Sequence, residues 1–359
     1  MQTATEPTSP DRPPVRAFLR EHRVALIASV VVTGGFLWVL QQGALPVLPD
    51  PAARAQLQPA AVVAYASVFL LMLMLRAVRW HWLLAPVHPV DWRRILLVNF
   101  LFFGASVTLP FRLAEAVRPA LIREKDKLSA WAIMGSVAAE RVVDGLFASL
   151  LLFVSLALAV PLDPLPMPAA LVPKAAYSAV GIFVALFVTL LVFYLWRNWA
   201  RRTTEVVIGV ASPKLARWLA DKVDHLADGL RFLPQLKYSV PFLLATACYW
   251  ALHVMGTWIL MRAAGLGGLE VAQAAAVVGV LALGMLVPNA PGFFGTFQIS
   301  VYAGLAMYRP GADVTGPGSV AVFWLYVVQI GMCLACGLVA LVFELRMRKR
   351  SARRVTPAL

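Results

Sequence analysis

The chain has 359 residues, of which 60% are hydrophobic and 14% are charged, and its mean hydropathy is +0.76. A soluble domain carries about 25% charged residues, so this composition excludes a disordered chain and argues against a soluble enzyme. Lys and Arg number 32 against 18 Asp and Glu, which gives a formal net charge of +14. A basic balance is typical of nucleic-acid-binding proteins, but a membrane explanation has to be tested first.

Apolar residues gather in runs that are long enough to cross a membrane, for which a helix needs about 20 residues. Six such runs are predicted to be full spans, at 24–42, 59–80, 129–160, 174–196, 239–262 and 319–345. The first run is interpreted as a retained helix, because a poor signal-peptide cleavage site follows it. The expected organisation is a tail at 1–23, one integral membrane domain at 24–345 and a basic tail at 346–359.

The basic residues predict how these spans are oriented, because loops on the cytoplasmic side carry an excess of Lys and Arg. Of the 32 basic residues, 27 fall in the tails and loops on one side of the predicted spans, and four fall on the other. Both termini are therefore predicted to be cytoplasmic, in the plasma (inner) membrane of a bacterial-type cell. The same asymmetry explains the net charge, so no nucleic acid is expected as a partner.

Two further apolar stretches, 95–110 and 271–308, have both ends on one side of this topology, so each is expected to belong to a re-entrant hairpin. The first hairpin is expected at 95–122 and the second at 271–308. Each lies between two spans, in units at about 59–160 and 239–345 that have opposite orientations. The predicted fold is an all-α polytopic membrane protein. It is an inverted repeat of helix–re-entrant hairpin–helix units, with about six full spans and two re-entrant hairpins, as in many transporters. The alternative is that hydropathy produces this symmetry by chance.

The segment 213–233 differs from the spans, because its apolar residues recur every three or four positions with charged residues between them. This period predicts an amphipathic helix, which would lie on the cytoplasmic surface of the membrane. A cytoplasmic helix that packs on neighbouring loops is the alternative interpretation.

The densest group of polar residues lies in the first hairpin, directly after Pro110. Arg112, Glu115 and Arg118 follow one another at intervals of three, so a helix would place them on one side. A carboxylate between two guanidinium groups stays ionised, and the remaining arginine donors can hold a phosphate in a bidentate manner. The alternative is a structural salt bridge that holds the hairpin against a partner segment.

A second charged group, Glu140, Arg141 and Asp144, lies inside the third apolar run. Charged side chains are rare within a spanning helix and usually face the interior of the bundle. Because the run is longer than the hydrocarbon core, we expect this group toward its cytoplasmic end. Pairing with Arg112 or Arg118 would then join both groups in one site that opens to the cytoplasm.

A third group forms the predicted tip of the second hairpin, at Pro288-Asn289-Ala290-Pro291-Gly292-Phe293-Phe294-Gly295. Its prolines and glycines break a helix, and free amide groups at the start of the next half-helix would favour an anionic group. A simple turn is the alternative. The sequence contains no P-loop, no H-E-x-x-H and no G-x-S-x-G motif, so neither an enzyme nor a cofactor or metal is expected.

Taken in order, the three groups resemble a known family. Asn99, then Pro110–Arg118 and then Glu140–Asp144 are similar to the N-terminal signature of the flippase-like membrane domain of lysylphosphatidylglycerol synthases. The family pattern there is Asn, then P-x-R-x-G-E-x-x-R, then E-R-x-x-D. The later stretch Pro291–Gln298 is similar to its P-G-G-x-G-x-x-E. The resemblance covers roughly residues 20–345.

Three positions depart from the family pattern: Ala114 and Phe293 each stand in place of a Gly, and Gln298 stands in place of a Glu. The missing carboxylate removes a charge or a proton site from the outer hairpin. The resemblance implies a stand-alone lipid translocator and not a synthase, because the expected membrane domain fills the chain and leaves no room for a soluble aminoacyl-transferase domain.

The predicted function is that of a translocator (flippase) that moves a phospholipid or a lipid-linked headgroup between bilayer leaflets. The expected partners are membrane lipids, either anionic or aminoacylated phospholipids or lipid-linked sugars, with a homo-oligomer or a partner enzyme left open. The residues expected at the headgroup are Arg112, Glu115, Arg118, Glu140, Arg141, Asp144 and Asn99. Those expected in the outer hairpin are Asn289, Pro291, Gly292, Gly295 and Gln298.

Two other functions compete with this prediction. One is a non-transporting scaffold or regulator of a lipid- or envelope-synthesising enzyme, with the amphipathic helix and the basic loops as its contact surface. The other is a membrane enzyme that acts on a lipid phosphate with Glu140 or Asp144 as the base. Neither a nucleophile nor a set of metal ligands in the sequence supports the enzyme.

Overall fold

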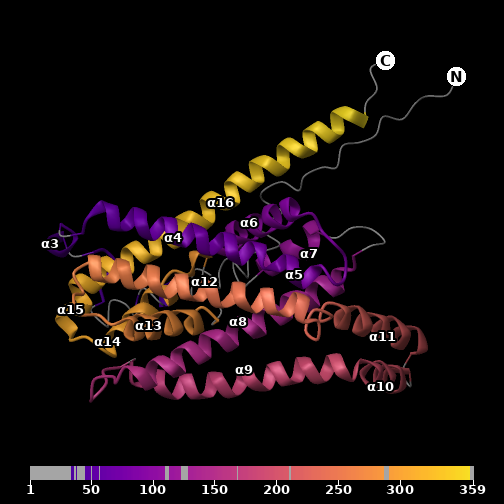
Figure 1. The fold of residues 1–359 in the computed structure, drawn as a ribbon, viewed down its shortest axis with the longest axis horizontal. Coiled ribbons are helices and arrows are strands. Elements are labelled where there is room, and N and C mark those ends of the chain that lie inside the picture. Colours follow the sequence, from indigo (N-terminus) through magenta and orange to yellow (C-terminus); the bar gives the residue numbers. More distant parts are fainter. Residues whose placement is uncertain are drawn as a thin grey trace.

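The structure is a computed structural model that describes residues 34–35, 38, 45–49, 51–55, 57–109, 113–122, 128–167, 169–209, 212–286 and 291–355. Within these residues it is helical and contains no strand, which confirms the predicted all-α class for this part of the chain. Figure 1 shows the long helices lying side by side, with the last helix, α16, extending beyond the others.

Five helical segments in the described part of the chain are long and apolar enough to cross a membrane. They are α4 with α5 (Pro59–Val78 and Trp80–Leu84), α8 (Ala130–Leu158), α9 (Val172–Leu195), α12 (Leu236–Ala263) and α16 (Pro317–Val355). They confirm five of the six predicted apolar runs as helices. The sixth run, 24–42, falls outside the described residues except for isolated positions.

Local capping explains where several helices begin. Pro59 starts α4. A proline has no amide hydrogen, but an amide at the first position of a helix has no partner within the helix, so no hydrogen bond is lost. Ser129 precedes α8, and its hydroxyl accepts a hydrogen bond from the Trp131 amide at 3.2 Å. Asp91 caps α6 (Trp92–Thr108) in the same way.

The remaining helices are shorter. They are α3 (Pro51–Arg54), α6 (Trp92–Thr108), η1 (Leu113–Ala116), α7 (Val117–Ile122), η2 (Ala169–Leu171), α10 (Arg197–Gly209), α11 (Pro213–Asp228), α13 (Val271–Gly284), η3 (Pro291–Phe293), α14 (Thr296–Ala306) and α15 (Gly311–Thr315). The two predicted hairpins correspond to α6 with η1 and α7, and to α13 with η3 and α14. Their re-entrant course stays a prediction, as do the inverted repeat and the orientation of the termini.

Three pairs of helices make the most extensive contacts between the two halves of the chain: α4 with α12, α6 with α16, and α13 with α8. Small residues allow two of these pairs to approach closely. A Cβ atom on Gly104 of α6 would lie 2.8 Å from the Cα of Gly337 on α16, and one on Gly279 of α13 would lie 2.7 Å from the Cβ of Leu152 on α8. If α4, α6 and α8 are exchanged for α12, α13 and α16, in that order, the α4–α12 pair maps onto itself and the α6–α16 pair maps onto the α13–α8 pair. The predicted inverted repeat would produce this symmetry.

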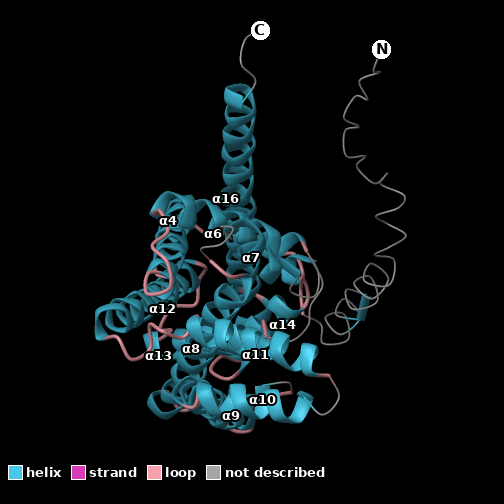
Figure 2. Cartoon of the chain, turned by 90° about the vertical axis from the view of Figure 1, so that its right-hand side faces the viewer, coloured by secondary structure: helices cyan, strands magenta, loops and turns pink. Residues whose placement is uncertain are grey.

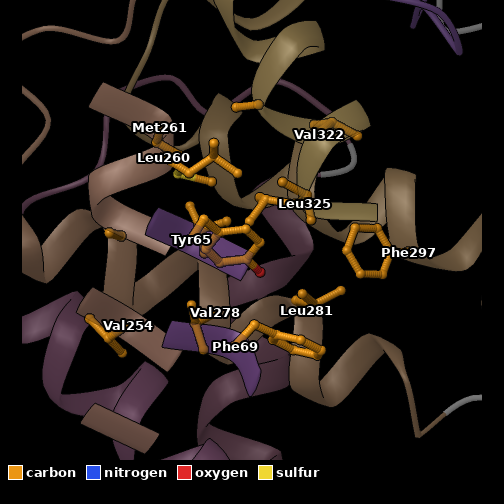
Figure 3. Packing of buried hydrophobic residues seen from close by; sticks show 14 of the residues in the cluster. Tyr65, Phe69, Val254, Leu260, Met261, Val278, Leu281, Phe297, Val322 and Leu325 are labelled. Carbon is orange, nitrogen blue, oxygen red and sulfur yellow. The ribbon is translucent and has the colours of Figure 1, made fainter. Parts of the chain in front are cut away.

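The largest apolar core lies where α4, α12, α13, α14 and α16 meet. Tyr65 and Phe69 of α4, Leu281 of α13, Phe297 of α14 and Leu325 of α16 are all buried there. Figure 3 shows these side chains converging from different helices. The core therefore joins both halves of the chain.

The helix α11 confirms a helix within 213–233, although it ends at Asp228 and not at residue 233. It packs against α8 and α10, at the side of the bundle away from α16 (Figure 2). Its buried face consists of alanines, Ala216, Ala220 and Ala227, whereas Leu215 and Trp218 stay exposed. This differs from the predicted single apolar face, because small side chains allow α11 to approach α8. Its place on the membrane surface stays a prediction.

The helix α16 continues well past the predicted end of the last span at residue 345. It runs to Val355 and so includes most of the segment that was predicted as a basic tail. Its C-terminal part projects from the body of the molecule in Figures 1 and 2.

Candidate functional site

A buried network of ion pairs lies between several helices. Arg79, at the junction of α4 and α5, donates to both carboxylate oxygens of Asp144, at 2.6 and 2.7 Å, and to Glu140 Oε1 at 2.7 Å. Arg118 of α7 donates to the other oxygen of Glu140. The side chains of Arg79, Arg118 and Glu140 are fully buried. Buried charges persist only when they are paired and hydrogen-bonded in this way.

The sequence spacing explains how α8 presents the two carboxylates. Glu140 and Asp144 are four residues apart, so they lie on one face of the helix. From the other side, α12 supplies two hydroxyl groups. Tyr249 Oη donates to Asp144 Oδ1 at 2.7 Å, and Thr246 Oγ1 accepts from Arg79 Nη1 at 3.0 Å. The network therefore links α4, α7, α8 and α12.

Aromatic rings enclose both buried guanidinium groups. The Arg118 Cζ atom lies 4.0 Å from the ring centroid of Phe102 and 4.9 Å from that of Trp80. The Arg79 Cζ atom lies 4.6 Å from the ring centroid of Tyr249. A planar guanidinium can stack on a ring and bind a carboxylate with two nitrogens, which a lysine ammonium does not do. These two positions are therefore specific for arginine.

A second, looser pair lies beside the network. The Arg141 Nε atom is 3.5 Å from Glu115 Oε1, and the two side chains are 27% and 30% exposed. Glu115 Oε2 and Arg141 Nη2 have no hydrogen-bond partner among the described residues. This pair is thus less constrained than the Arg79 and Arg118 pairs, and its polar atoms are available to a ligand.

A cavity of about 240 Å³ opens next to both pairs. Four charged residues line it, together with His253 and Gln329; these four are Arg76, Glu115, Arg141 and Asp144. The rest of the wall is largely apolar and includes Met285, Phe293 and Phe297 from the α13–α14 region. A cavity with charged and apolar lining suits a ligand that has a polar and an apolar part.

The region predicted as the outer hairpin contributes two aromatic side chains, Phe293 and Phe297, to the cavity wall. Gly292 and Gly295 have φ angles of 72° and 87°, a left-handed conformation that favours glycine. Phe293, where the resembling family has Gly, adopts a φ of 57°. Gln298 is buried and its Oε1 accepts the Gly295 amide hydrogen at 2.7 Å, so this amide is not free for an anion. Pro291 begins η3, and Asn289 lies outside the described residues.

The structure brings together most, but not all, of the residues predicted from sequence. Ion pairs connect Arg118, Glu140, Arg141 and Glu115, and Asp144 joins this set through Arg79. The set includes the expected contact between Arg118 and the second charged group.

Glu115, Arg112 and Asn99 do not show the predicted arrangement in the described part of the chain. Glu115 pairs with Arg141, whereas the sequence pattern placed it between Arg112 and Arg118. Arg112 lies outside the described residues. Asn99 is buried on α6, where its amide donates to the Ile95 carbonyl at 2.8 Å, and it does not line the cavity.

Sequence reasoning missed two arginines of the site. Arg76 and Arg79 were counted among the basic residues of a cytoplasmic loop, but Arg79 is completely buried and Arg76 lines the cavity. Two signals in the sequence pointed to them. They are three residues apart at the end of an apolar run, and the carboxylate pair Glu140 and Asp144 needs more than one cation nearby.

The comparison with protein families assigns the chain to a family. A family model described as Lysylphosphatidylglycerol synthase TM region matches residues 26–333, which is more than half of the chain. The chain belongs to this family. The match includes every charged residue of the cavity and the outer hairpin. Searches among curated proteins and among solved structures found no match. The family and the apolar helices together identify a multi-pass membrane protein linked to lipids.

Proposed function

We propose that the protein moves a phospholipid or a lipid-linked headgroup between the leaflets of the membrane. The observation that carries this proposal is the cavity, which combines four charged side chains with an extended apolar wall inside a bundle of membrane-spanning helices. A lipid is a ligand with such a polar and an apolar part. Membership in a family of lipid-linked membrane proteins supports the same conclusion.

Each part of the site would have its own role in this function. Arg141, Glu115 and Asp144 line the cavity and would contact the headgroup. Arg79, Arg118 and Glu140 are buried behind them and would hold these groups in position. The glycines of the outer hairpin would permit the backbone movement that opens the cavity to the other side of the membrane.

The proposal includes the topology. Both termini would be cytoplasmic, in a bacterial-type plasma (inner) membrane, because Lys and Arg concentrate in one set of loops. The contacts of α6 with α16 and of α13 with α8 support an inverted repeat. In such a repeat, rocking of one half against the other exposes a central site to each side in turn.

The function is tested by filling the cavity. Ala282 of α13 lines it, and Ala282→Trp would place an indole ring where the lipid binds. A matched control is Ala185→Trp, because Ala185 is exposed on α9. In proteoliposomes with a fluorescent phospholipid, Ala282→Trp should slow flipping at least tenfold, whereas Ala185→Trp should leave the rate unchanged. An unchanged rate in a folded Ala282→Trp protein would contradict the proposal.

The alternative function is that of a scaffold for a lipid- or envelope-synthesising enzyme, which moves no lipid itself. The exposed α10–α11 pair and the projecting end of α16 offer contact surfaces for such a partner. This alternative predicts a stoichiometric enzyme in the purified complex, no flipping by the wild-type protein and no bound lipid.

A further inference from the structure

The charges around the cavity do not balance. Within the described residues, Arg79, Arg118 and Arg141 each lie within ion-pair distance of a carboxylate of Glu115, Glu140 or Asp144, three cations against three anions. Arg76 also lines the cavity and has no ion pair with any described residue. Among the described residues, the site therefore carries one positive charge in excess. An uncompensated charge at membrane depth is unfavourable, so an anion is expected to join it.

The position of Arg76 directs its charge into the cavity. It lies on α4, three residues before Arg79, and its side chain is partly buried. Its Nε atom is buried and has no hydrogen-bond partner among the described residues. Its Cζ atom lies 5.7 Å from the ring centroid of Phe103, which also lines the cavity. The guanidinium is thus held at the wall with donors that no acceptor of the described residues uses.

The neighbouring wall is also rich in donors. Trp250 lines the cavity, and its indole nitrogen is buried without a hydrogen-bond partner among the described residues. Gln329 lines the cavity beside His253, and its amide donates to Tyr65 Oη at 2.9 Å. A buried donor without an acceptor is costly, and a phosphate oxygen would supply the missing acceptor.

We propose that Arg76, together with Trp250, binds the single negative charge of a phosphodiester, supplied by the headgroup of a membrane phospholipid. This inference rests on the proposed function, because it takes the bound lipid to be the one that is moved. One excess cation matches one phosphodiester. A lipid-linked diphosphate would bring more negative charge than the described residues neutralise, so their charge count favours phospholipids over diphosphate-linked sugars.

The test measures lipid binding to the purified full-length protein by native mass spectrometry. The probes are phosphatidylglycerol, inorganic phosphate and a polyprenyl diphosphate, each added at the same concentration. Arg76→Gln should reduce the bound fraction of phosphatidylglycerol at least fivefold, and Arg76→Lys should retain most of it. Arg93→Gln is the matched control, because Arg93 is exposed near the start of α6, and it should bind as the wild type does.

Three results would overturn the inference. One is phosphatidylglycerol binding by a folded Arg76→Gln protein that equals wild-type binding. Another is competition by inorganic phosphate at equal concentration, which would show that the ligand is a free anion. The third is stronger binding of the polyprenyl diphosphate. A melting curve for each variant separates lost binding from lost folding, and retained binding in Arg76→Lys excludes a purely structural effect.

Failure of this inference differs from failure of the proposed function. If the wild-type protein flips phosphatidylglycerol and Arg76→Gln still binds it normally, the assignment of Arg76 is wrong and the translocator stands. If Arg76→Gln loses binding but the wild-type protein flips no lipid in proteoliposomes, the binding site stands and the translocator is wrong.

Discussion

At the scale of single residues, Arg79 is the centre of the buried network. It contacts Glu140 and Asp144 from one face of α8 and a hydroxyl group of α12, so one side chain joins three helices. Removing one member of a buried pair leaves the others unpaired, which costs about 3–5 kcal/mol. The same reasoning applies to Arg118. Arg118→Ala is therefore expected to unfold the protein, so this variant would give no information on lipid binding.

Arg79→Met should therefore destabilise the protein strongly, by about 3–5 kcal/mol, because two buried carboxylates lose their bidentate partner. The matched control is Arg201→Met, since Arg201 forms its ion pairs on the exposed surface of α10, where such pairs contribute little to stability. Thermal melting in detergent, followed by tryptophan fluorescence, measures both. Equal melting temperatures for the two variants would show that the network is not structural.

Glu115→Gln should separate binding from stability. The Glu115 pair with Arg141 is long and partly exposed, so its loss should change the free energy of unfolding by about 1 kcal/mol or less. If Glu115 contacts the headgroup, the flipping rate in proteoliposomes should fall about tenfold. Glu205→Gln on exposed α10 is the control and should leave the rate unchanged. A normal rate for Glu115→Gln would remove this residue from the lipid site.

At the scale of elements, the turn between α13 and α14 depends on left-handed backbone. Gly292 has a φ of 72°, and a Cβ atom there would lie 3.1 Å from Tyr326 Oη. Phe293 adopts a similar φ without the freedom of glycine, and its ring packs at the cavity wall. The departure from the family's Gly thus exchanges backbone freedom for a larger apolar surface in the cavity.

Gly292→Ala should lower the stability of the protein by about 1–2 kcal/mol, because an alanine in the left-handed region is strained. Gly311→Ala is the control, since a Cβ atom at Gly311 meets nothing within 4 Å and Gly311 has no positive φ. Thermal melting of both variants measures the difference. A melting temperature for Gly292→Ala at or above the Gly311→Ala value would show that the turn is not strained.

Hydropathy predicted the long helices closely, because an apolar run and its caps act locally. The run 129–160 became α8 at Ala130–Leu158, with Ser129 as its cap. The role of Arg79 was not predictable in this way, because its partners lie more than 60 residues along the chain. The packed alanine face of α11 was missed for a similar reason, since close approach to α8 depends on glycines such as Gly135 in a different helix.

At the scale of the whole molecule, the two halves share one core and one cavity. The residues that line the cavity come mainly from α4, α6, η1 and α8 of the first half and from α12, α13, η3, α14 and α16 of the second. Each half alone would expose this apolar surface, so we expect the halves to fold as one unit. Movement of one half against the other would change the access to the cavity.

The orientation of the whole molecule can be tested with single cysteines. The background replaces Cys248, Cys333 and Cys336 by serine. Lys214→Cys on α11 should react with an impermeant maleimide only in inverted vesicles, and Gly267→Cys between α12 and α13 only in intact cells with the outer membrane opened. Both positions are exposed. Labelling of both from the same side would contradict the predicted topology.

The length of α16 has a practical consequence for imaging. With 39 residues, the helix is about 58 Å long, whereas the hydrocarbon core of a membrane is about 30 Å thick. If α16 spans the membrane as predicted, part of this continuous helix would extend beyond the bilayer. A rigid domain fused in helical register after Val355 would keep a fixed orientation to the bundle. It would lie outside the detergent micelle, where its asymmetric shape would help to align the images of single particles.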